Sequence, residues 1–263
     1  MSELHPDIAA VLSGDRQWCV INADCQDVLP ALPDQSVAHV ISDPPFEEQA
    51  HTKQRRVKRG KSVGSGDNRV AKIDALSFEP LSFELRSFCG KQFARIAKRW
   101  SIVFCQTEAS QLWREAMAEL SYRRTGIWVK PDGMPQLTGD RPGMGYETIV
   151  FCHRKGRSKW NGGGRSSVFV HNKNSGGKHW HETQKPEPLM IELVELFTEV
   201  GEIILDPFCG SGTTGAAALR RGRRFIGIER DAKHAETARE RLNAESQGSN
   251  LHARRAGQGA LFA

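Results

Sequence analysis

EIILDPFCGSGTTGAAALRRGRRFIGIE, residues 202–229, is the stretch that decides the fold. An apolar run, a glycine-rich loop, an alanine-rich run and a second apolar run follow one another, which predicts strand, loop, helix and strand. The expected bounds are Glu202–Leu205, Asp206–Gly215, Ala216–Arg221 and Arg224–Ile228, in that order. This is one βαβ unit, so the sheet should be largely parallel, with helices on both faces.

The glycine-rich loop indicates a cofactor that contains adenosine. Gly210, Gly212 and Gly215 have the G-x-G-x-x-G spacing, and Glu229 stands 19 residues after Gly210, at the end of the next strand. Glycines let the backbone approach a ligand closely, and the acid can accept hydrogen bonds from ribose hydroxyls. A nicotinamide cofactor is disfavoured, because Asp206 would repel a pyrophosphate and only 48 residues follow Gly215. S-adenosylmethionine carries no phosphate and two cationic groups, so a carboxylate suits it.

The remaining apolar patterns predict a single α/β domain with a doubly wound, Rossmann-like sheet of about seven strands and helices on both faces. We expect residues 1–246 to form this domain, with a mobile basic loop at 47–73, an insertion for target recognition at 153–182, and a flexible tail at 247–263. Further strands are expected at Trp18–Asn22, Val37–Ile41, Ser101–Cys105, Ile127–Val129 and Thr148–Cys152. Helices are expected at Asp24–Leu32, at Phe83–Lys98, after a Thr107 cap with Leu112, Ala116 and Leu120 inward, from Pro186 with Leu189, Leu193, Leu196 and Val200 inward, and after an Asp231 cap.

The net charge of +6 is concentrated in two places and indicates a polyanionic partner. Residues 51–61 hold six Lys and Arg, and a second acid-free stretch, between Glu147 and Glu182, holds seven, which leaves the rest of the chain at −7. A single charge run is often only a solvated face, but two on an otherwise acidic chain favour nucleic acid. The candidate contacts are Lys53, Arg55, Arg56, Lys58, Arg59 and Lys61 in the first stretch, and Arg154, Lys155, Arg157, Lys159 and Arg165 in the second.

Cysteine usage and hydropathy argue against metal and membrane classes. The six cysteines are scattered without a C-x-x-C pair, so we expect buried free thiols. Residues 179–182 (HWHE) lack the H-E-x-x-H spacing, and no metal is expected. No apolar run is long enough to span a membrane and no secretory signal precedes the first strand, which predicts a cytoplasmic protein.

A second loop, Asp43-Pro44-Pro45-Phe46, follows the strand expected at Val37–Ile41. With this loop, the chain resembles the DNA amino-methyltransferases, in the circularly permuted group where the catalytic motif precedes the cofactor loop. The resemblance covers residues 18–46, 128–130, 146–151 and 181–229. It implies an S-adenosylmethionine-dependent enzyme that methylates an exocyclic amino group of a base in double-stranded DNA, as in restriction-modification systems.

The chemistry of amino methylation explains why the loop has these residues. An exocyclic amino nitrogen is a poor nucleophile, because its lone pair is delocalised into the ring. If the Asp43 carboxylate and the Pro44 carbonyl both accept hydrogen bonds from it, the nitrogen is drawn towards tetrahedral geometry. Pro44 and Pro45 fix the loop, and Phe46 would stack on a base that is flipped out of the duplex.

In the resembled family, further positions contact the cofactor. Those that match Asp206, Phe208, Gly210 and Gly212 surround its methionine part, while Glu229 takes the ribose. The remaining expected contacts are Asp24 beside the adenine, Ser211, Thr213 and Thr214 in the glycine-rich loop, and Thr183, Lys185 and Pro186 beside the methionine carboxylate. Asp24 could equally be a helix cap, and Lys185 a solvated lysine.

Three alternatives stay open at this point. Cytosine N4 is less favoured than adenine N6, because the family's cytosine members more often carry Ser in place of Asp43. An RNA substrate is disfavoured because the insertion at 153–182 has no RNA-binding module signature. A non-catalytic nucleic-acid-binding subunit is disfavoured because both functional loops are present. Since the insertion is short, we expect a short or relaxed recognition sequence.

The end of the chain carries one further motif. Residues Gln258–Phe262 (QGALF) resemble the peptides by which bacterial DNA enzymes dock on the replication sliding clamp. The alternative is an ordinary frayed terminus. Whether the protein forms a homodimer is left open by the sequence.

Overall fold

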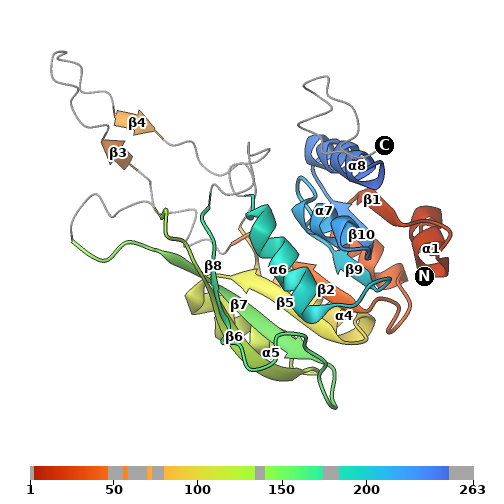
Figure 1. Ribbon diagram of the computed structural model, residues 1–263, viewed down its shortest axis with the longest axis horizontal. Helices are drawn as coiled ribbons and strands as arrows, with labels where there is room; N and C mark the ends of the chain where they lie inside the picture. The colour runs from red at the N-terminus through yellow and green to blue at the C-terminus, as the bar shows by residue number, and fades with distance from the viewer. Residues whose placement is uncertain are drawn as a thin grey trace.

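The computed structural model describes residues 3–46, 56–58, 70–72, 80–133, 140–173 and 184–248. Within these residues the main feature is an eight-stranded sheet, in the order β1-β10-β9-β2-β5-β7-β6-β8 (Figure 1). Its strands are β1 (Trp18–Asn22), β2 (His39–Ser42), β5 (Trp100–Cys105), β6 (Ser121–Val129), β7 (Tyr146–His153), β8 (Val168–Val170), β9 (Ile203–Asp206) and β10 (Arg224–Glu229). All neighbours are parallel except that β7 runs against β5 and β6. The predicted α/β fold with a largely parallel sheet is therefore confirmed.

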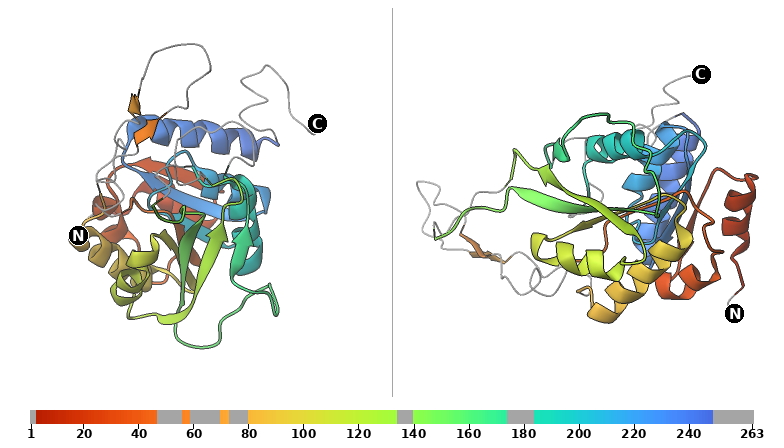
Figure 2. Two further views of the ribbon diagram at one scale, coloured as in Figure 1. Left: turned by 90° about the vertical axis from the view of Figure 1, so that its left-hand side faces the viewer. Right: turned by 90° about the horizontal axis from the view of Figure 1, so that it is seen from below.

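Helices cover both faces of this sheet (Figure 2). On one face lie α1 (Pro6–Ser13), α2 (Cys25–Val28), α4 (Phe83–Ile96) and α5 (Ser110–Ala116), and on the other α6 (Glu187–Phe197), α7 (Thr213–Arg220) and α8 (Ala232–Ser246). Each layer has its own apolar core, as a sheet buried on both faces requires. In the first core Phe93 stacks on Trp113 with ring centroids 6.0 Å apart, and in the second Phe151 stacks on Phe197 at 4.8 Å.

The βαβ unit that the sequence predicted is present as β9, α7 and β10. Helix α7 begins at Thr213, three residues before the predicted start, directly after the last left-handed glycine of the loop. Gly215 lies in its first turn, where an added Cβ would stand 2.7 Å from the Phe225 ring on β10. The absence of a side chain there lets the helix pack closely against the strand that follows it.

Three predicted features of the helices need correction. Leu112 is 38% exposed, because α5 turns the larger Trp113 into the core instead. Thr107 does not cap that helix; it begins a short 3-10 turn, η2 (Thr107–Ala109). Val200 is 75% exposed, because α6 ends at Phe197 and the chain has left the apolar face before Val200.

The segments expected to be irregular contain regular structure. Strand β8 lies inside the predicted insertion 153–182 and extends the sheet by pairing in parallel with β6. Within the predicted loop 47–73, β3 (Arg56–Lys58) and β4 (Val70–Lys72) pair with each other in antiparallel fashion. A second 3-10 turn, η1 (Leu29–Ala31), follows α2. Among the described residues, no helix has the length and apolar character needed to cross a membrane.

Candidate active site

A cavity of about 560 Å³ opens at the carboxyl ends of the parallel strands. It forms where the loops after β1, β2, β9 and β10 meet, because these four strands are neighbours in the sheet. Open α/β sheets bind their ligands at this edge. The sequence-predicted residues that line it are Asp24, Asp43, Pro44, Pro45, Phe46, Lys185, Asp206, Phe208, Gly210, Ser211, Thr213, Thr214 and Glu229. The fold thus brings together two loops that lie far apart in the sequence.

Asp206 is the most buried carboxylate of the cavity wall, with 2% of its surface exposed. Its oxygens accept hydrogen bonds from Ser42 Oγ at 2.9 Å, from Thr214 Oγ1 at 2.6 Å and from the Phe208 amide at 3.2 Å. Burial nevertheless raises the pKa of Asp206 to about 7, with the nearby charge of Asp43 acting in the same direction. A cationic ligand beside this carboxylate would stabilise its ionised form.

The glycine-rich loop is held in place by the acid that follows it. One Glu229 oxygen accepts a hydrogen bond from the Gly210 amide at 2.8 Å, and the other accepts from the Asp231 amide at 2.9 Å. Gly212 has φ +80°, a left-handed conformation that side chains disfavour, and an added Cβ would lie 3.1 Å from the Ala238 Cβ on α8. This residue therefore shapes the loop rather than the cavity surface.

The other predicted cofactor residues divide into three groups. Asp24 caps α2 through the Gln26 amide at 2.8 Å and also lines the cavity, so the cap is confirmed and the contact with the adenine stays a prediction. Pro186 is the N-cap residue of α6 and is not among the lining residues. Thr183 lies outside the described residues.

Asp43 follows β2 and faces the cavity with 26% of its side chain exposed. Its Oδ2 accepts a hydrogen bond from Lys185 Nζ at 2.6 Å, whereas its Oδ1 is buried and has no hydrogen-bond partner among the described residues. Burial raises the pKa of Asp43, and the Lys185 ammonium opposes that rise. The Phe46 ring lies beside the same ammonium, with its centroid 5.4 Å from Lys185 Nζ. One acceptor atom of this loop thus has no hydrogen-bond partner among the described residues.

Sequence reasoning missed two charged residues of this site, Lys130 and Glu147. Lys130 directly follows β6, and Glu147 is the second residue of β7, so both stand at the carboxyl edge of the parallel strands. They form an ion pair with each other, and Lys185 Nζ lies 3.1 Å from the second Glu147 oxygen. In the sequence, each of these charged residues stands at the end of an apolar strand, and this feature could have indicated a site. Only the strand order shows that they lie close to Asp43.

The charges of this cluster compensate one another. Burial favours neutral Glu147, yet the ammonium groups of Lys185 and Lys130 outweigh it and lower the pKa of that carboxyl. Burial likewise disfavours the Lys185 cation, but the carboxylates of Asp43 and Glu147 raise its pKa. The ionised forms of Glu147 and Lys185 are therefore favoured although water is largely excluded, whereas burial lowers the pKa of Lys130 and raises the pKa of Asp43.

The five predicted DNA contacts of the second basic stretch are not among the residues that line the cavity, whereas Lys173 of the same stretch is. This stretch starts after His153, which pairs with Trp100 at the beginning of β5, whereas Asp43 lies beyond the other end of the sheet. The guanidinium of Arg154 donates to the carbonyls of Ala94 at 2.6 Å and Ala97 at 2.8 Å. This arginine thus satisfies carbonyls at the end of α4, and its contact with DNA stays a prediction.

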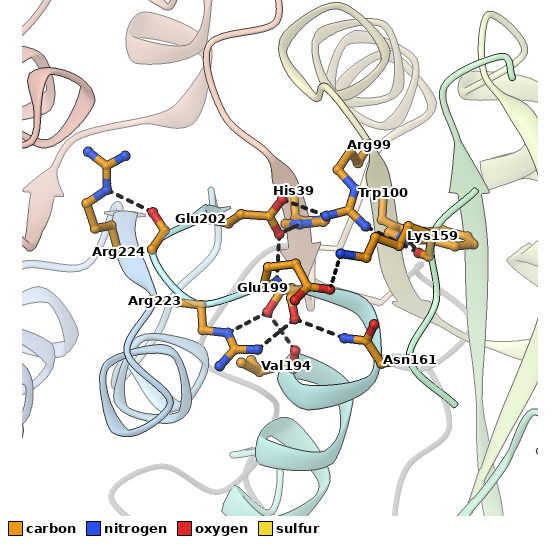
Figure 3. Close-up of polar contacts among 12 residues, drawn as sticks. His39, Arg99, Trp100, Lys159, Asn161, Val194, Glu199, Glu202, Arg223 and Arg224 are labelled. Carbon is orange, nitrogen blue, oxygen red and sulfur yellow. Dashed lines mark hydrogen bonds and ion pairs between the residues drawn. The ribbon is translucent and has the colours of Figure 1, made fainter. Parts of the chain in front are cut away.

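Lys159 lies at this same amino edge (Figure 3). Lys159 forms an ion pair with Glu199 at 2.9 Å, and its carbonyl accepts a hydrogen bond from the Trp100 indole. Arg165 forms an ion pair with Glu192 of α6. The exposed residues Lys155 and Arg157 lie in the same segment.

The first basic stretch is described only in part. Arg56 and Lys58 lie in β3, while Lys53, Arg55, Arg59 and Lys61 lie outside the described residues. The HWHE segment and the QGALF motif also lie outside them. In the part of the chain that is described, no group of three or more His, Cys, Asp or Glu residues could hold a metal ion.

Comparisons with known proteins agree with this geometry. A model of the N6/N4 DNA methylase family matches residues 37–240 of the chain. Type II methyltransferase M.HinfI of Haemophilus influenzae is 26% identical over 249 residues, which cover 85% of this chain and 67% of M.HinfI. Type II methyltransferase M2.DpnII of Streptococcus pneumoniae is 27% identical over 252 residues, which cover 87% of this chain and 90% of M2.DpnII.

Solved structures share the fold. The complex of M1.HpyAVI with SAM superposes with a TM-score of 0.65 at 23% identity, covering 86% of this chain and 99% of M1.HpyAVI. PvuII DNA methyltransferase, described as cytosine-N4-specific, gives a TM-score of 0.63 at 15% identity, covering 85% of this chain and 86% of that one. The backbone arrangement is therefore similar to that of a protein solved with SAM and to that of one described as cytosine-N4-specific.

Proposed function

This chain belongs to the N6/N4 DNA methylase family, and we propose that it transfers a methyl group from S-adenosylmethionine to adenine N6 of a flipped-out base in double-stranded DNA. The observation that carries the proposal is the Asp43 carboxylate at the cavity wall. Its Oδ1 is buried without a partner among the described residues, so a hydrogen-bond donor brought into the cavity would satisfy it. The amino group of a base is such a donor.

The cofactor half of the cavity fits S-adenosylmethionine. The carboxylates of Asp24, Asp206, Glu229 and Asp231 line it, and these acceptors suit a ligand with positive charges and ribose hydroxyls. Phe208 adds an apolar wall. When bound, the cofactor supplies a methyl group on a sulfonium, which is an electrophile. Asp206, with its raised pKa, gains most from a neighbouring cation.

The base half of the cavity activates the nucleophile. Asp43 Oδ1 and the Pro44 carbonyl accept hydrogen bonds from the amino group, and this withdraws its hydrogens from the ring plane and exposes the lone pair. Phe46 gives the extruded base an aromatic surface to stack on. Ser42 connects the two halves, because it ends β2 beside Asp43 and donates to Asp206 at 2.9 Å. The two loops are therefore held in fixed register.

Adenine is the preferred target because the loop has Asp rather than Ser at position 43. The overall fold does not discriminate, since it superposes similarly well on the PvuII enzyme. The test is to incubate the protein with methyl-labelled cofactor and unmethylated DNA, digest the DNA to nucleosides and identify the labelled one. Label in N6-methyladenosine supports the proposal. Label in N4-methylcytosine shows that the target is cytosine, and label in neither contradicts the proposal. RNA of the same sequence is the control for polymer type.

The Asp43→Asn variant tests the named residue. It keeps the shape of the side chain but presents an amide in place of a carboxylate, so cofactor binding should persist while transfer falls about 100-fold or more. Asp27→Asn on the exposed side of α2 is the matched control and should transfer normally. Equal activity of both variants would remove Asp43 from the reaction.

The two relatives described as Type II methyltransferases also suggest the kind of target. We propose that this protein methylates one short, defined DNA sequence, with the basic residues 51–61 contributing phosphate contacts. Sequencing of methylated DNA would check this, and a long, strict recognition sequence would contradict it.

A further inference from the structure

We propose that Lys185 positions the Asp43 carboxylate, and is itself held by Glu147, instead of binding the carboxylate of the cofactor. This inference rests on the proposed function, because Asp43 is the acceptor of the amino group there. It assigns to Lys185 a role in the chemistry half of the cavity. The same inference makes Glu147 part of the site.

The contacts of the Lys185 ammonium carry the proposal. Its Nζ lies 2.6 Å from Asp43 Oδ2 and 3.1 Å from Glu147 Oε2, and only 8% of the side chain is exposed. Two aromatic rings lie beside the same ammonium, since the centroids of Phe46 and Phe104 are 5.4 Å and 5.1 Å from Nζ. A buried cation between two carboxylates and two ring faces is already paired on several sides.

Topology places Lys185 on the base side of the cavity. Asp43 follows β2 and Glu147 belongs to β7, and β5 lies between these two strands in the sheet order. The cofactor loop follows β9 on the opposite side of β2, next to β10. The Lys185 side chain therefore lies between β2 and β7, whereas the neighbouring Gln184 accepts a hydrogen bond from Ser211 of the glycine-rich loop at 3.2 Å.

Charge balance supports the same assignment. Glu147 also pairs with Lys130, whose Nζ lies 4.6 Å from the centroid of the Trp128 ring. The row Asp43, Lys185, Glu147 and Lys130 alternates in sign and is neutral as a whole. Lys185 therefore already has two carboxylate partners within the chain.

In this arrangement the two Asp43 oxygens have different roles. Lys185 engages Oδ2 and thereby fixes the carboxyl, which leaves Oδ1 to accept from the base. The ammonium also favours the ionised carboxyl against burial and against the negative charges of Glu147 and Asp206. The Phe46 ring also lies beside the Lys185 ammonium, so Lys185 places the acceptor and the stacking surface together.

The test compares Lys185→Met, which removes the charge at similar length, with Lys185→Arg, which keeps it. For Lys185→Met we expect the dissociation constant of S-adenosylmethionine to change less than about twofold, while the single-turnover rate at saturating cofactor falls about 100-fold. Lys185→Arg should recover part of that rate. Lys98→Met, an exposed lysine remote from the cavity, is the control. A large loss of cofactor affinity with an unchanged rate would overturn the proposal.

A second readout does not depend on catalysis. Titration of the Asp43 carboxyl by ¹³C NMR should give a higher pKa in Lys185→Met than in the wild type, and a smaller change in the opposite direction in Glu147→Gln, which removes a negative neighbour. An unchanged Asp43 pKa in both variants would overturn the proposal. If the wild-type protein transfers no methyl group, the proposed function fails, and the titration still decides whether Lys185 controls Asp43.

Discussion

Replacing Asp206 by Asn should stabilise the protein above neutral pH and weaken its affinity for the cofactor. The carboxyl is 2% exposed and accepts three hydrogen bonds, from Ser42, Thr214 and the Phe208 amide. Burial raises its pKa from 3.8 to about 7, so the folded protein holds this proton more tightly than the unfolded chain. An Asn side chain has no proton to lose and keeps a similar shape.

The sign and size follow from this pKa difference. A group whose pKa is raised by folding contributes fully below its unfolded pKa, and that contribution is lost as the pH rises through the folded value. A difference of about three pH units at 1.36 kcal/mol each corresponds to about 4 kcal/mol as an upper bound. The wild type should therefore lose stability relative to Asp206→Asn between about pH 4 and 7, with no further change above that.

Urea unfolding at a series of pH values from 5 to about 8.5 measures this difference, with Asp27→Asn as the control that should follow the wild type. In the same pH range the affinity for S-adenosylmethionine should increase in the wild type, because the cation binds the ionised carboxyl. The Asp206→Asn variant should bind it about 10-fold more weakly at pH 8, the loss expected for one charge-assisted hydrogen bond. Parallel stability curves for wild type and Asp206→Asn would refute the reasoning.

Three further outcomes are expected. Gly212→Ala should destabilise the protein by about 1–2 kcal/mol, because φ is +80° and the new Cβ would lie 3.1 Å from Ala238. In Gly164→Ala, the control, the new Cβ meets no atom within 4 Å, so the thermal melting curve should change little. Arg154→Ala should lower the free energy of unfolding in urea by about 2–3 kcal/mol and leave the salt dependence of DNA binding unaltered. A flatter salt dependence would show that Arg154 contacts DNA. Neutralising the six basic residues of 51–61 should lower the slope of log K against log salt by about 0.9 for each phosphate that the protein no longer neutralises, and an unchanged slope would exclude this stretch from binding.

Local patterns predicted the elements well where one residue period dominates. The strands at Trp18–Asn22 and at β5 and β10 agree with the prediction within a residue, because their runs are apolar on both faces. The register of α5 was wrong because two faces of that helix carry apolar residues. Only the packing of Trp113 on Phe93 selects one of them.

The basic stretch after β7 shows a different limit. Its charge predicts DNA contacts, and local patterns did not predict that Arg154 donates to carbonyls of residues 57 and 60 positions earlier in the chain. Since β7 runs antiparallel to its neighbours, the chain emerges at the amino edge of the sheet, away from the catalytic loop. A strand direction, which no local pattern encodes, decided where these charges lie.

The sequence by itself determined the chemistry that each loop can perform. The DPPF loop and the glycine-rich loop are local, so their residue types and spacing, with the family resemblance, predict an amino-group acceptor and a pocket for a cationic nucleoside. Only the tertiary structure decided how these groups meet. Lys185 reaches Asp43 across 142 positions of sequence, and Glu147 joins them, because the strand order brings β2 and β7 to either side of β5. A buried charge is stable only beside its partner, and that partner is chosen by the fold.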